Sequence, residues 1–74
     1  MKTTDALREI MKIREVGVTK LANRLNKKQN VISERLKLVN MSIGTLTEMV
    51  RVLDYKVVLI PSDETTPKGG YEIE

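Results

Sequence analysis

The sequence of 74 residues contains no cysteine, histidine, tryptophan or phenylalanine. Without cysteine there is no disulfide framework and no thiolate chemistry, which fits an intracellular, cytoplasmic protein. No cluster of metal-ligating residues is present, so we expect no metal and no cofactor. No apolar run approaches the roughly 20 residues that a membrane span needs, and residues 3–7 are too polar for a signal peptide.

The same absences leave few groups for catalysis. An enzyme needs a nucleophile with a base, a pair of carboxylates in a cleft, or a glycine loop that holds phosphate. The carboxylates of this chain are scattered over predicted helix surfaces or lie near the C-terminus, and Gly69 and Gly70 have no Walker-type lysine beside them. We therefore expect that the protein is not an enzyme.

The net charge of +3 is distributed unevenly. Residues 61–74 contain four acidic residues and one lysine, a net charge of −3, so residues 1–60 carry +6. A body this small and this basic suits a polyanion as partner, although a solvated surface is the alternative. Two parts are predicted, a folded domain over 1–60 and a flexible acidic tail over 61–74.

Apolar periodicity predicts four short helices in the domain. They cover about residues 4–15, 19–25, 29–36 (or as far as 39) and a segment that begins after Ser42. We expect caps from Thr3, Thr4 or Asp5, from Thr19, and from Ser42, with Ile43 in the core. The fourth helix has the clearest pattern, with apolar residues at Leu46, Met49, Val50 and Leu53. Residues 55–60 are rich in β-branched and aromatic residues and stop at Pro61, which predicts one strand.

The second and third helices are separated by only a few residues. Leu21, Ala22 and Leu25 share one face of the first of these helices, and Ile32 and Leu36 share one face of the second. Asn26 follows the last apolar residue of the first helix, where a left-handed residue commonly ends a helix. The stretch thus predicts a helix–turn–helix, with Leu36 in the core.

This stretch resembles the helix-turn-helix of the Cro and phage-repressor family, also called the XRE family. The residues that carry the resemblance are Leu-Ala-x-x-Leu-x at 21–26 and Gln-x-x-Ile-Ser at 29–33. The resemblance implies a mainly α, λ-repressor-like fold of four short helices plus one C-terminal strand. It also implies a sequence-specific DNA-binding regulator, most simply a small homodimeric repressor that occupies a near-palindromic operator.

The third helix carries the predicted contacts with DNA bases, because a helix-turn-helix inserts the start of its second helix in the major groove. These residues are Lys28, Gln29, Asn30, Ser33 and Glu34. The predicted phosphate contacts are Thr19, Lys20, Arg24, Lys27, Arg35 and Lys37. The plainer interpretation of both sets is an ordinary polar helix surface with solvated charges.

The predicted strand needs a partner, because a single strand leaves its backbone groups unpaired. One possible partner is Tyr71-Glu72-Ile73 in a hairpin across a loop with Pro67, Gly69 and Gly70. The other is the same strand of a second molecule, and we favour this pairing. The predicted dimerisation residues are Tyr55, Val57, Val58, Leu59 and Ile60.

Small members of the family also act as antitoxins, and the acidic tail would then bind a toxin; the alternative is that the tail is only a solubilising end. A different hypothesis is a protein-interaction module that kept the fold without DNA binding. Its basis is that Gly17-Val18 stands where the family usually has Thr-Gln, and Leu36 where it has Glu.

Overall fold

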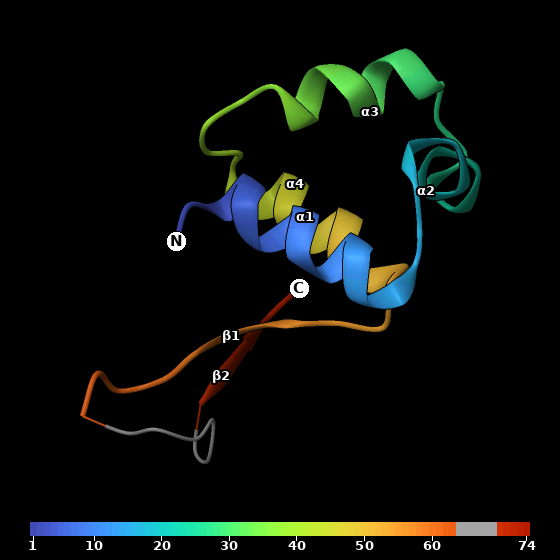
Figure 1. Ribbon diagram of the computed structural model, residues 1–74. Coiled ribbons are helices and arrows are strands. Elements are labelled where there is room, and N and C mark those ends of the chain that lie inside the picture. The colour runs from blue at the N-terminus through green and yellow to red at the C-terminus, as the bar shows by residue number, and fades with distance from the viewer. Residues whose placement is uncertain (64–69) are drawn as a thin grey trace.

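The computed structural model describes residues 1–63 and 70–74 of the chain (Figure 1). Within these residues the fold is mainly helical, with a small antiparallel sheet near the C-terminus, which confirms the expected fold class. The elements are α1 (Thr3–Arg14), α2 (Val18–Leu25), α3 (Gln29–Leu36), α4 (Ile43–Arg51), β1 (Val57–Leu59) and β2 (Tyr71–Ile73). None of the helices in the described part combines the length and the apolar character needed to cross a membrane.

Side-chain caps were predicted for α1, α2 and α4, and the prediction is confirmed for α4 alone. Ser42 caps α4, because its Oγ accepts a hydrogen bond from the Thr45 backbone N–H at 3.2 Å. The N-cap of α1 is Lys2 and that of α2 is Gly17, and neither has a side-chain cap, so the caps predicted for these helices are wrong. Thr19 lies inside α2, which begins earlier than expected, at Val18.

Thr3 has a different role from the expected cap. Its Oγ1 accepts a hydrogen bond from the Met41 backbone N–H at 2.7 Å. The Thr3 backbone N–H also donates to Asn40 Oδ1 at 3.3 Å. These contacts join the start of α1 to the segment between α3 and α4, so that the hydroxyl stabilises a tertiary contact.

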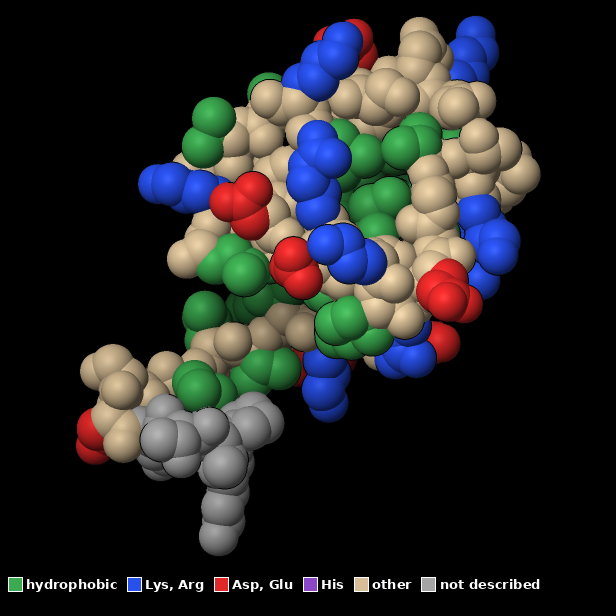
Figure 2. Space-filling view, viewed as in Figure 1, with side chains coloured by type: hydrophobic (Ala, Val, Ile, Leu, Met, Phe, Trp, Pro, Cys, Tyr) green, Lys and Arg blue, Asp and Glu red, His purple; other side chains and the backbone are tan. Residues whose placement is uncertain are grey.

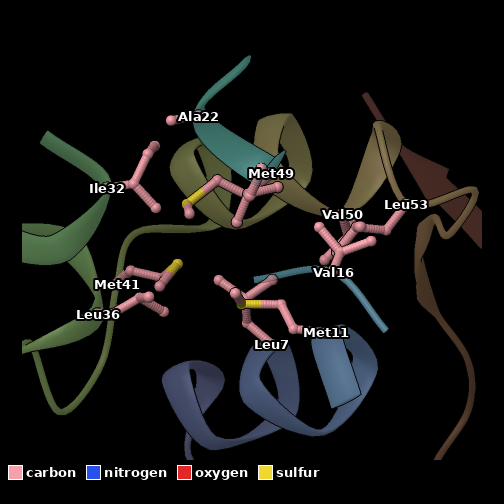
Figure 3. Packing of buried hydrophobic residues seen from close by; sticks show 11 residues of the cluster. Leu7, Met11, Val16, Ala22, Ile32, Leu36, Met41, Met49, Val50 and Leu53 are labelled. Atoms are coloured by element: carbon pink, nitrogen blue, oxygen red, sulfur yellow. The ribbon is translucent and has the colours of Figure 1, made fainter. Parts of the chain in front are cut away.

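All four helices contribute to one core. The largest fully buried side chains are Leu7, Leu21, Ile32, Met49 and Leu53. Figure 3 shows labelled side chains from all four helices and from segments that follow them converging on one volume. The core therefore holds α3 against the layer in which α1 and α4 lie side by side (Figure 1).

Two core predictions at the edges of helices have opposite outcomes. Leu36 is only 6% exposed and is the last residue of α3, which confirms its place in the core. Ile43 is 49% exposed, so its expected burial is wrong. Ile43 is the first residue of α4, and the buried face of that helix is formed by Thr47, Met49 and Val50.

The predicted strand is paired within the chain. β1 runs antiparallel to β2, with Val57 opposite Ile73 and Leu59 opposite Tyr71. The hairpin is thus observed, it occupies one edge of β1, and residues 71–73 form a strand where we expected a flexible tail. The remainder of the predicted loop, residues 64–69, lies outside the described residues.

The register explains why the hairpin forms. Opposite residues of an antiparallel pair point to the same face, so Val57, Leu59, Tyr71 and Ile73 make one apolar face. The Lys56 ammonium lies 3.4 Å from a Glu72 carboxylate oxygen. A Cβ at Gly70 would lie 2.9 Å from the Leu59 carbonyl oxygen, so this position requires glycine.

The burial of neighbouring residues on α3 gives a stability prediction. Ile32→Ala should lower the free energy of unfolding by about 2–5 kcal/mol, because it leaves a cavity in the core. Val31→Ala is the matched control, since Val31 on the same helix is 37% exposed, and we expect less than about 1 kcal/mol. Urea denaturation followed by circular dichroism measures both, and equal losses would contradict this placement of α3.

Candidate nucleic-acid interface

The turn between α2 and α3 is built around Asn26, as the sequence predicted. Its backbone is left-handed, with φ 55° and ψ 44°. The Asn26 N–H donates to the Asn23 carbonyl at 3.2 Å, and the Lys27 N–H donates to the Ala22 carbonyl at 3.0 Å. These bonds satisfy carbonyls at the end of α2 and reverse the chain. Figure 1 looks nearly along α2 and across α3, so the two helices cross steeply.

The predicted base contacts lie on the outer side of α3. Lys28 is its N-cap, and Lys28, Gln29, Asn30 and Glu34 are exposed, while Ser33 is half-buried. Asn30, Ser33 and Glu34 have the i, i+3, i+4 spacing of one helical face. Ile32 and Leu36 are turned into the core instead. The structure thus brings the five predicted residues together at the first two turns of one helix.

A weak ion pair lies at the far end of this surface. The Lys37 ammonium is 3.2 Å from a Glu34 carboxylate oxygen, and both side chains are about 70% exposed. An ion pair this open to solvent contributes little to stability, because water and salt screen it. Both side chains therefore can turn toward another partner at small cost.

A second group of predicted contacts lies at the start of α2. Thr19 and Lys20 are both exposed there. Because Gly17 supplies no side-chain cap, the first backbone N–H groups of α2 have no side-chain acceptor among residues 1–63 and 70–74. The start of a helix also carries a partial positive charge. Thr19, Lys20 and these N–H groups together suit the approach of a phosphate.

Besides Lys37, three more of the predicted phosphate contacts have partners within the chain. Arg24 donates to the Val52 carbonyl at 3.2 Å. A carboxylate oxygen of Glu48 on α4 lies 3.1 Å from the Arg35 guanidinium and 3.7 Å from the Lys27 ammonium. These cations therefore hold α2 and α3 to the end of α4. In the view of Figure 2, the basic side chains are spread around the helical body and do not form a single stripe.

The structure also contains contacts that sequence reasoning missed. Arg8 on α1 donates to the Leu36 carbonyl at 2.7 Å and so satisfies an orphan acceptor at the end of α3. Glu48 was not assigned a role, and its partner Arg35 is 13 residues distant. Such pairs give no helical i, i+4 signal, because they depend on how the helices cross. Within residues 1–63 and 70–74, no group of three or more potential metal ligands is found.

The predicted dimerisation residues divide into two sets. Tyr55 and Val57 are partly buried and pack against the core, and the Arg14 guanidinium lies 5.1 Å from the centre of the Tyr55 ring. Leu59 and Ile60 are 58% and 39% exposed. Val58 is half-buried. The outer end of the hairpin is thus the part that remains accessible to a second molecule.

Comparisons with models of protein families, with curated proteins and with solved structures find no match to this chain. The functional argument therefore depends on the residues themselves and on their geometry.

The left-handed conformation of Asn26 gives a prediction about stability. Asn26→Ala should lower the free energy of unfolding by about 1–2 kcal/mol, because a Cβ-bearing residue without a polar side chain is disfavoured at positive φ. Asn26→Gly is the control that removes this cost, and it should equal or exceed the wild type. Urea titration measures both. An alanine variant as stable as the glycine variant would show that this backbone conformation does not limit stability.

Proposed function

We propose that this protein is a sequence-specific, double-stranded DNA-binding regulator of the Cro and phage-repressor type, acting in the cytoplasm. The observation that supports it best is the polar outer face of α3, where the five predicted base-contacting residues lie together. α3 has two turns and is held by a core on its other side. This is the arrangement that a recognition helix needs in order to enter the major groove.

The side chains on this face match the chemistry of base edges. The amide of Gln29 or Asn30 can bind adenine in a bidentate manner, accepting from its N6 amino group and donating to N7. Lys28 can donate to the guanine acceptors, and Glu34 can accept from the amino group of cytosine. Thr19 and Lys20, at the start of α2, then bind a phosphate and fix the register of α3 in the groove.

Repression by occupancy follows most simply from a homodimer. Among the described residues, β1 is paired with β2 along one edge only. Pairing the other edge of β1 with the same strand of a second molecule would give a four-stranded sheet about a two-fold axis. Two recognition helices roughly 34 Å apart, one turn of DNA, would then bind a near-palindromic operator and block the polymerase.

A second candidate function is a protein-interaction module that does not bind DNA. The observation that favours it is the pairing of Lys27 and Arg35 with Glu48, which reduces the charge available for phosphate. The exposed Leu59 and Tyr71 at the hairpin would then contact a protein partner. A salt titration with random duplex DNA separates the two functions. A DNA-binding protein binds at low salt and loses this affinity steeply as salt rises, whereas the interaction module does not bind even at low salt.

Substitutions on the two helices should separate specificity from affinity. Gln29→Ala or Asn30→Ala should each cost roughly 1–3 kcal/mol on the site selected from random duplexes and little on other DNA. Lys20→Ala should weaken binding to all sequences alike and flatten the log–log salt dependence by about 0.9. Fluorescence anisotropy at several salt concentrations measures these effects. Equal losses on all sequences for Gln29→Ala would place α3 outside the groove.

The outer end of the hairpin tests the dimer. Leu59→Asp should yield monomers, because it would place a charge in the shared sheet and the apolar contact would be lost. Ile13→Asp is the control, since Ile13 on α1 is 66% exposed and should leave the dimer unchanged. Sedimentation equilibrium measures both. A Leu59→Asp protein that remains dimeric would place the subunit contact elsewhere on the chain.

A further inference from the structure

We propose that Glu48, on α4, limits the affinity of this protein for DNA. Its carboxylate binds the side chains of Lys27 and Arg35 and so keeps these cations away from phosphates. The inference rests on the proposed function, because it concerns the charge of the same surface. It assigns a regulatory role to a residue of α4 that lies outside the predicted base and phosphate contacts. Glu48 would thus act through two cations on the helix-turn-helix and not through a contact of its own with a base.

The first support is the geometry of the two ion pairs. Lys27 lies in the turn before α3 and Arg35 in its last turn, and both reach the same carboxylate oxygen of Glu48. The Arg35 pair is the closer one, at 3.1 Å, and it is also a hydrogen bond. A single carboxylate therefore engages cations from both ends of the predicted recognition helix.

The second support is the degree of burial of the three side chains. Arg35 is 23% exposed, Lys27 is 34% exposed and Glu48 is 44% exposed. These values contrast with the Glu34–Lys37 pair, in which both side chains are about 70% exposed. The Glu48 pairs are less screened by water than that pair and hold their cations more firmly. The three side chains are still partly exposed, so their charges contribute to the electrostatic potential at the surface that would face DNA.

The third support is the small number of charges on this surface. Nonspecific affinity for DNA depends on how many phosphates the cations neutralise, at about 0.9 units of log–log salt slope for each. Without Glu48, two more cations would be available beside Lys20 and Lys28. Stronger phosphate binding is independent of sequence, so it would retain the protein on random DNA, which outnumbers any operator. Glu48 therefore keeps the sequence-independent part of the affinity low.

The test is Glu48→Gln, which removes the charge and preserves the size of the side chain. The matched control is Glu9→Gln on α1, an exposed position where the same change of net charge occurs without freeing Lys27 or Arg35. Both variants are titrated with random duplex DNA and with the selected site over a tenfold range of salt. Thermal unfolding of both variants and of the wild type shows whether they remain folded.

We expect Glu48→Gln to steepen the salt slope by about 0.9 for one released cation and about 1.8 for two. Its gain in affinity over the wild type should then grow by about 8-fold or 60-fold for each tenfold dilution of salt. The gain should be the same on random and selected DNA. The Glu9→Gln slope should equal that of the wild type, because a distant charge adds no phosphate contact.

The other outcomes are decisive as well. A Glu48→Gln slope equal to the wild-type slope overturns the role of Glu48 and leaves the proposed function intact. A loss of affinity confined to the selected site would show that Glu48 orients α3, and this also overturns the proposal. A folded wild-type protein that binds no DNA even at low salt overturns the proposed function and, with it, the role of Glu48.

Discussion

The burial of Ile32 and Leu36 beneath α3 is the constraint on which the rest of the structure depends. α2 and α3 have eight residues each, and helices this short are not stable alone in water. Their helical state therefore comes from the core that they share with α1 and α4. By fixing which side of α3 is inside, these two residues also fix which side is outside. The polar residues Gln29, Asn30 and Glu34 are exposed as a consequence of packing, and the candidate interface is the reverse side of the core.

The elements that could be predicted from the sequence are those governed by local patterns. Apolar spacing predicted four helices with approximately correct bounds, the small polar Asn26 predicted the left-handed turn, and Ser42 predicted the cap of α4. Four of the five predicted base contacts are exposed and Ser33 is half-buried, because these residues alternate with the core positions along α3. The cap at Thr19 was wrong for a local reason too, since Gly17 begins the helix without a side chain and places the hydroxyl inside α2.

The features that could not be predicted join residues far apart in the chain. Nothing local shows that Arg8 binds the end of α3 or that Thr3 binds Met41. The hairpin partner of the strand is also far away in the chain, and the apolar character of both faces of β1 led us to favour a second molecule as its partner. The register with β2 explains the hairpin, since Ile73 and Tyr71 continue the apolar face and Gly70 permits a close approach that a Cβ would block.

Several charged side chains of this chain already have partners within the molecule. A net charge of +6 over residues 1–60 predicted a basic surface, but Arg24 and Arg35 use their donors to hold α2 and α3 to the end of α4. An arginine with a carbonyl or carboxylate partner no longer offers all of its donors to phosphate. A count of cations therefore overstates the available charge, and the geometry of α4 decides how much of it remains. In so small a domain, the same cations fix the position of α3 and are the predicted contacts with the DNA backbone.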